Sequence, residues 1–366
     1  MQTAILYRQE LKEHDFGLGH PFRSERYRIF MDFFREYPSE DNFQIIEPGY
    51  ATDADLLLVH SEEYISFVES FYKATASGLS LPSAFRFLSG DNIPRPGAGK
   101  LNEAARLIVG SSKLAGEIVW EGKFGQAVAL GGGSHHASSS YGEGFCLYND
   151  VAICARNLKQ KYGLDRILIL DTDAHAGNGT AEIFYHSSGI LFIDLHQDPR
   201  TLYPGKGFAH EIGSGTGEGY TVNVPLPLFA GYDSYELVFD EIVFPLAEEF
   251  KPQIIIRNGG SDPHFADELT QLGLTLEGFR MIGTKVRELA KLCSGKVVDL
   301  LGSGYNLKVL PLGWLALICG LTDTRFDIEE PFPIPQRIKE DCALAGTKAI
   351  VEQVKRNLKA HWRCFE

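Results

Sequence analysis

The sequence predicts an α/β fold in which helices flank a central, mostly parallel β-sheet. Short apolar runs, rich in β-branched residues, have the length of buried parallel strands. Helix-like segments lie between these runs, and such alternation is typical of α/β proteins. The chain has 366 residues and shows neither a repeat nor a linker, so we expect one domain over residues 1–366.

The predicted elements follow one another along most of the chain. Helices are expected over 101–122 and 276–295, and "YTVNVPL" (220–226) has the pattern of a further strand. The proline-rich segment 329–336 predicts a surface loop before a terminal helix. The predicted buried strands are "QAVAL" (126–130), "RILIL" (166–170), "GILFIDL" (189–195), "PQIIIR" (252–257) and "KVVDLL" (296–301).

Composition and charge narrow the function classes. Apolar residues make up 44% of the chain and charged residues 23%, as in soluble globular proteins. No apolar run is long enough to predict a membrane-spanning helix, and the N-terminus has no secretory signal pattern. The net charge of −13 argues against direct nucleic-acid binding, which needs a basic face.

Six cysteines are scattered along the chain without a C-x-x-C pair. In a chain of this length they indicate reduced thiols, so we expect a cytoplasmic protein. The cysteines are Cys146, Cys154, Cys293, Cys319, Cys342 and Cys364.

Glycines and polar side chains follow four of the predicted strands directly. "GGGSHH" follows 126–130, "DTDAH" follows 166–170, "NGGSDPH" follows 252–257 and "GSGYN" follows 296–301. Ligands of open α/β sheets bind beyond the carboxyl ends of the strands. The sequence therefore predicts one site built from four loops.

Two of these loops carry potential metal ligands. Asp173 and His175 are two residues apart, so on extended backbone their side chains point the same way. Asp262 follows another buried strand and is the natural third ligand, and three protein ligands with an open position suit catalytic zinc. Iron(II) or cobalt(II) also suits this oxygen-rich set. Each aspartate alone could instead be a turn or capping residue.

The other two loops carry groups that could move protons. His135 and His136 could serve as base and acid, although adjacent histidines could also be metal ligands or turn residues. Asp171 could accept a hydrogen bond from one imidazole and raise its basicity. Tyr305 could donate to the oxyanion of a tetrahedral intermediate, or be structural.

Five motifs, in order along the chain, resemble the arginase/deacetylase superfamily. More narrowly, the sequence is similar to the zinc-dependent histone deacetylases and their bacterial and archaeal relatives, including acetoin-utilisation-type proteins. The resemblance implies a single-domain arginase/deacetylase-like fold and a metal-dependent amide hydrolase that removes acetyl or other acyl groups from lysine side chains or similar amines. The motifs are "GGGSHHASSSYGEGFCLYND", "DTDAHAGNGT", "DLHQDPRTLYPGKGF", "NGGSDPHFADELTQLGLT" and "GSGYN".

The resemblance also implies roles for individual residues. Asp173, His175 and Asp262 would bind Zn²⁺, with Fe²⁺ or Co²⁺ as alternatives. His136 would be the general base and acid, and His135 its electrostatic partner.

Further roles follow around this centre. Asp171 would hydrogen-bond His135, Asn178 would be the partner of His136, and Tyr305 would polarise the scissile carbonyl. Arg26 matches an arginine of the internal cavity below the metal.

A narrow substrate channel is implied as well. Phe145 and Tyr203 match its aromatic walls, Gly144 its floor and Leu269 a position near its mouth. Asp91 matches the rim aspartate that holds the substrate backbone.

The family also binds a monovalent cation, here expected to be K⁺, through backbone carbonyls close to the metal. The matching positions are Asp171, Asp173 and His175, together with Asp194 and Leu195 on the next strand.

The chain departs from the family pattern at four positions. Ala176 stands where a second histidine is frequent, and Asn178 stands in place of an aspartate, which should leave His136 less strongly oriented by charge. Asp194 replaces a usual serine and adds a carboxylate near the cation segment. Arg257 lies at a strand end that is usually apolar, and nothing in the sequence accounts for it.

Three other functions are alternatives to the deacetylase interpretation. An acetylpolyamine amidohydrolase would share the chemistry, and the substrate could be an acetylated lysine peptide or a small acetylated amine. A non-catalytic acyl-lysine binding protein should have lost a ligand, a histidine or the tyrosine, and none is missing. A dinuclear manganese ureohydrolase needs a D-x-H-x-D pattern, but the last position here is Gly177.

Overall fold

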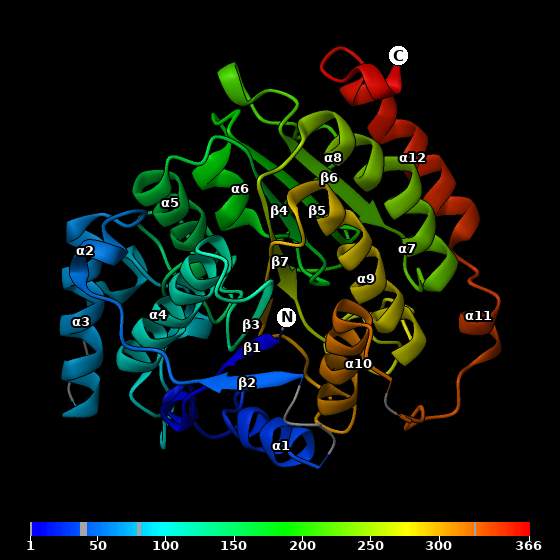
Figure 1. Ribbon diagram of the computed structural model, residues 1–366. Helices are drawn as coiled ribbons and strands as arrows, with labels where there is room; N and C mark the ends of the chain where they lie inside the picture. The colour runs from blue at the N-terminus through cyan, green and yellow to red at the C-terminus, as the bar shows by residue number, and fades with distance from the viewer. Residues whose placement is uncertain (1, 37–41, 79–81, 326) are drawn as a thin grey trace.

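An eight-stranded sheet forms the centre of the molecule, seen in a computed structural model that describes residues 2–36, 42–78, 82–325 and 327–366 (Figure 1). The strand order is β2-β1-β3-β8-β7-β4-β5-β6, and every described strand pair is parallel. The strands are β1 (Thr3–Leu6), β2 (Phe43–Ile46), β3 (Gln126–Leu130), β4 (Ile167–Asp171), β5 (Ile190–Gln197), β6 (Thr221–Leu226), β7 (Ile254–Gly259) and β8 (Val297–Leu301). The predicted α/β class and parallel sheet are confirmed.

The strands read as continuous apolar runs because both faces of the sheet are covered. In β4, Ile167 and Ile169 pack on one face, whereas Leu168 and Leu170 pack on the other. All four side chains are fully buried. β1 and β2 were not predicted from the sequence, because runs of four residues are too short to show a period.

Helices cover the two faces of this sheet. Figure 1 shows α4, α5 and α6 on one side, and α7, α8, α9 and α12 on the other. The predicted helix 101–122 is α4, and 276–295 comprises α9 and a short 3-10 turn over Ala290–Cys293. Within the described ranges, no helix is both long and apolar enough to span a bilayer. The helices are α1 (Glu25–Phe34), α2 (Asp53–Leu56), α3 (Glu62–Ala76), α4 (Leu101–Trp120), α5 (Asp150–Tyr162), α6 (Asn178–Phe184), α7 (Tyr232–Val238), α8 (Phe244–Phe250), α9 (Leu276–Leu289), α10 (Leu310–Thr322), α11 (Gln336–Lys339) and α12 (Leu344–Leu358).

The structure accounts for Arg257, which the sequence left unexplained. Arg257 lies on β7 directly opposite Asp299 on β8, and the two side chains form an ion pair. Both side chains are almost completely buried, so loss of either one would leave the other charge buried and unpaired. Arg257 also reaches Thr172 Oγ1 at 3.4 Å, and so links β8 to the segment that leaves β4.

Candidate active site

The four loops that carry the predicted site leave neighbouring strands. β3, β8, β7 and β4 are consecutive in the sheet, so their carboxyl ends meet at one edge. Residues from the loops after β3, β4 and β8 line one small cavity of about 40 Å³, and the loop after β7 brings Asp262 into contact with His175. Its lining includes His135, His136, Phe145, Asp173, His175 and Tyr305.

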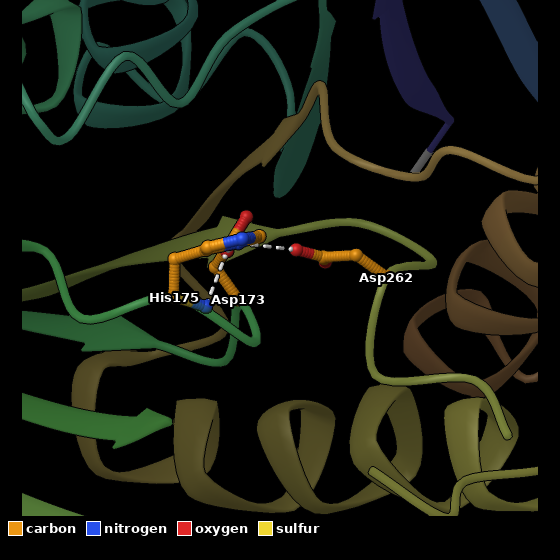
Figure 2. Close-up of side chains that lie close together, drawn as sticks. All are labelled: Asp173, His175 and Asp262. Atoms are coloured by element: carbon orange, nitrogen blue, oxygen red, sulfur yellow. Dashed lines mark hydrogen bonds and ion pairs between the residues drawn. The ribbon is translucent and has the colours of Figure 1, made fainter. Parts of the chain in front are cut away.

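Asp173, His175 and Asp262 form a buried cluster at this edge. Figure 2 shows their side chains converging, with Asp262 approaching from the loop after β7. His175 Nδ1 lies 3.0 Å from Asp173 Oδ1 and 3.1 Å from Asp262 Oδ2. One ligand atom from each residue lies within 4.8 Å of the other two. The three side chains are therefore close enough to share one ion.

The electrostatics of the cluster fit a bound cation. Burial and the neighbouring Asp173 carboxylate raise the pKa of Asp262 to about 8. Burial opposes charge on His175, but the two carboxylates outweigh it and raise the pKa of that imidazole to about 10. Ser303 Oγ donates to Asp262 Oδ1 at 2.6 Å, which leaves Oδ2 directed at the cluster. Two buried carboxylates and an imidazole nitrogen are a suitable donor set for a divalent ion.

His135 has a carboxylate partner. Its Nδ1 lies 2.8 Å from Asp171 Oδ2, and the Asn258 amide donates to the same oxygen at 2.8 Å. Burial lowers the pKa of His135, but the carboxylates of Asp171 and Asp173 outweigh this effect and raise it to about 9. His135 is therefore cationic at neutral pH.

His136 has an amide partner instead. Its Nδ1 lies 2.7 Å from Asn178 Oδ1. Burial, together with the nearby imidazoles of His135 and His175, lowers the pKa of His136 well below its usual range. A neutral imidazole in the cavity can accept a proton, which is the state that a general base requires.

A buried aspartate that the sequence analysis did not single out supports the histidine loop. Asp150, at the start of α5, accepts hydrogen bonds from the backbone N–H groups of Gly133 and Ser134 at 3.0 and 2.7 Å. Ser112 donates to the same carboxylate at 2.5 Å. These contacts fix the backbone immediately before His135.

Tyr305 reaches the cavity from the loop after β8. Its ring lies 6.3 Å from that of His175 and 6.1 Å from that of Phe145. Burial raises the pKa of Tyr305 well above its usual range, so the phenol keeps its proton and can donate. The guanidinium of Arg26 lies 5.4 Å from the Tyr305 ring, and its Nη1 donates to Gly302 O at 2.9 Å.

Asp267 positions two of the predicted residues at once. One carboxylate oxygen accepts from the Tyr305 N–H at 2.8 Å, and the other accepts from the Leu269 N–H at 2.9 Å. Asp267 could not be identified from the sequence, because nothing local distinguishes it from a surface aspartate.

Of the predicted channel residues, Gly144 and Phe145 line the same cavity. Tyr203 packs edge-on against His136 with 5.1 Å between the ring centroids, and it remains 42% exposed. Leu269 is 39% exposed. Asp91 accepts from the Gly144 N–H at 3.1 Å. Gly144 has a φ of +59° and lies against the His136 ring, where a side chain would not fit.

The segment predicted to hold a monovalent cation lies where β4 and β5 are paired. Asp171 is opposite Asp194 in the sheet register, and Leu195 is the next residue of β5. The Asp194 carboxylate accepts from the Gly177 N–H at 2.8 Å and pairs with His196 Nδ1 at 2.9 Å. Both carboxylate oxygens of Asp194 therefore already have partners within the protein.

Ala176, the other departure on this segment, is almost completely buried. It borders a cavity of about 350 Å³ that is also lined by Asp194 and Gly207. His175, the expected ligand, is present, so the alanine leaves the cluster complete.

The chain matches the model of the histone deacetylase domain over residues 20–321, so it belongs to the histone deacetylase family of deacetylating hydrolases. An Archaeoglobus fulgidus protein named "Probable deacetylase" is 38% identical, with both chains fully covered. The acetoin utilization protein AcuC of Bacillus subtilis is 33% identical over 85% of this chain and 80% of its own. The crystal structure of the HDA15 HD domain superposes with a TM-score of 0.82 at 28% identity, over 100% of this chain and 97% of that one.

Proposed function

We propose that this protein is a zinc-dependent deacetylase that hydrolyses the amide of acetyl-lysine or of a similar acylated amine. The observation that carries the proposal is the joint position of the Asp173–His175–Asp262 cluster, the His135–His136 pair and Tyr305: five of these six side chains line one cavity, and Asp262 contacts His175 behind it. We further propose that residues 1–366 act as one catalytic domain.

The three cluster residues would hold the Zn²⁺ ion. The chemistry that such an ion supplies when bound is polarisation of a carbonyl oxygen and a lowered pKa of water. Fe²⁺ or Co²⁺ would suit the same oxygen-rich donor set. Ser303 would keep Asp262 oriented, because its hydroxyl occupies the other carboxylate oxygen.

His136 would transfer protons, and His135 and Tyr305 would stabilise the negative charge that develops. His136 takes a proton from the attacking water and later delivers it to the leaving amine, while the new C–O bond replaces the C–N bond. His135 remains cationic beside Asp171 and stabilises negative charge that develops on the substrate. Tyr305 donates a hydrogen bond to the developing oxyanion. The products are a carboxylate and a free amine.

The channel residues favour a thin acyl chain. Phe145 and Tyr203 supply flat walls, and the absence of a side chain at Gly144 gives the floor its depth. Leu269, which is exposed, and Asp91, which accepts from the Gly144 N–H, would lie at the outer end, where a peptide or polyamine backbone would pass. An acetylpolyamine is a second candidate substrate, since Asp91 and Glu143 place carboxylates beside the channel.

We further propose a bound monovalent cation and a cellular location. K⁺ would bind the backbone carbonyls of Asp171, Asp173, His175 and Leu195, with Asp194 packed beside them. We place the protein in the cytoplasm because all six cysteines are free thiols.

The test is acetate release by the purified protein on a panel of acetyl-lysine peptides, acetylated polyamines and small acetylated amines. Turnover should disappear with a chelator and return when Zn²⁺ is restored, and Fe²⁺ and Co²⁺ should be compared in parallel. A protein that binds acylated peptides with metal restored but releases no acetate from any substrate would refute the proposal.

A further inference from the structure

Glu143 connects the proton-accepting histidine to the channel wall. One carboxylate oxygen, Oε1, accepts from the Asn178 amide Nδ2 at 2.7 Å. The other oxygen, Oε2, accepts from the Tyr203 hydroxyl at 2.9 Å. Asn178 in turn contacts His136 Nδ1 at 2.7 Å through its carbonyl oxygen. The four side chains therefore form a continuous chain of hydrogen bonds.

The carboxylate determines which way the Asn178 amide faces. A carboxylate accepts hydrogen bonds and has none to donate, so Asn178 must direct its NH₂ group at Glu143. The carbonyl oxygen of Asn178 must then face His136, and Nδ1 of that imidazole must carry the hydrogen. The Nε2 lone pair is left free, which is the tautomer that a general base needs.

Without Glu143, no carboxylate would fix the orientation of the Asn178 amide. The Asn178 amide could rotate to present NH₂ to His136 and so favour the other tautomer. An aspartate at position 178 would have no such ambiguity, because both of its oxygens accept. Glu143 therefore compensates for the amide that this chain has at position 178.

We propose, on the basis of the deacetylase function above, that Glu143 is a positioning residue for this reaction. It orients Asn178 so that His136 is held as the base, and it fixes the Tyr203 ring across the channel. Its influence on the chemistry passes through Asn178, whereas its influence on the channel passes through Tyr203.

A charge exchange between positions 143 and 178 tests this role. In N178D, two carboxylates would replace the 2.7 Å hydrogen bond, so the variant should lose at least about tenfold in kcat and a few degrees in Tm. In E143Q/N178D, the glutamine amide can donate to the new aspartate. We expect the double variant to recover kcat to within about threefold of the wild type and to recover Tm.

Single variants separate the two contacts of Glu143, the one with Asn178 and the one with Tyr203. E143A removes both contacts, so it should lower kcat about tenfold because the base is disoriented, and it should change KM about as much as Y203F does because the Tyr203 hydroxyl loses its acceptor. E143Q should lose less, because its carbonyl oxygen can still accept from Asn178. Y203F keeps the Asn178 contact, so it should affect KM more than kcat. Glu352→Gln, at an exposed position on α12, is the matched control and should change neither parameter.

The outcomes distinguish this inference from the proposed function. A wild-type protein that releases no acetate refutes the proposed function, whereas Tm still reports whether residues 143 and 178 are coupled. A double variant no better than N178D in kcat and Tm overturns the inference while the deacetylase assignment stands. E143A with wild-type kcat would also overturn it.

Discussion

Replacing Gly144 with alanine should slow catalysis by displacing His136. A Cβ at this position would lie 2.2 Å from His136 Cδ2 and 2.6 Å from Cγ. Ordinary van der Waals contact begins near 3.4 Å, so the imidazole or the loop must shift by about 1 Å. A misplacement of about 1 Å at a reacting group lowers turnover on the order of 100-fold. We therefore expect kcat of Gly144→Ala to fall by about two orders of magnitude.

Backbone strain must be separated from this clash. Gly144 has a φ of +59°, and alanine in the left-handed region costs about 1 kcal/mol of stability. Gly163, at the end of α5, has a φ of +69° and no atom within 4 Å of its added Cβ. Gly163→Ala is therefore a control with the same strain and no clash, and it should keep wild-type kcat.

The assay is steady-state acetate release for both variants, with urea unfolding to measure the shared loss of stability. If folded Gly144→Ala retains kcat within threefold of the wild type, His136 does not need its observed position. If Gly163→Ala loses kcat as well, strain and not the clash explains the effect.

Three further predictions concern the site and its support. Tyr305→Phe should lower kcat about 100-fold or more with a small change in KM, because the phenol acts on developing charge; equal changes in the two parameters would argue against that role. Burial lowers the pKa of His60 from 6.5 to about 4, so the unfolded chain binds more protons between these values and stability falls as pH drops through this window. His60→Gln keeps an acceptor for the Asn149 N–H but has no titrating group. The free energy of unfolding of the wild type relative to this variant, measured in urea, should therefore fall by about 3 kcal/mol between pH 7 and pH 4. Parallel pH profiles of stability for the two proteins would contradict this. Arg257→Met should lower the free energy of unfolding by about 3 kcal/mol because it leaves Asp299 buried and unpaired, and Arg257→Met/Asp299→Leu should recover most of that loss; no recovery would mean that the loss comes from packing.

The site could be predicted from the sequence because its residues follow recognisable strands. Four of the buried strands lead directly into glycines and polar residues, and parallel strands present their carboxyl ends at one edge. Asp173, His175 and Asp262 could therefore be grouped before any distance was known. β1 and β2 could not be predicted because four residues carry too little periodicity.

The supporting contacts could not be predicted in this way. Glu143 meets Asn178 across 35 residues of chain, and Asp267 meets the Tyr305 backbone across 38. Arg257 and Asp299 face each other only because of the register between β7 and β8. Such pairings depend on the three-dimensional arrangement of loops and strands, which local sequence patterns do not encode.

The two adjacent histidines show how these contacts assign chemistry. By residue type and spacing alone, His135 and His136 are equivalent neighbours, and only the family resemblance implies different roles for them. In the structure, His135 faces the Asp171 carboxylate, which raises its pKa to about 9 despite burial. His136 faces the neutral amide of Asn178, and burial lowers its pKa well below the usual range. One imidazole is therefore held as a cation and its neighbour as a base, and partners distant in the chain produce the difference.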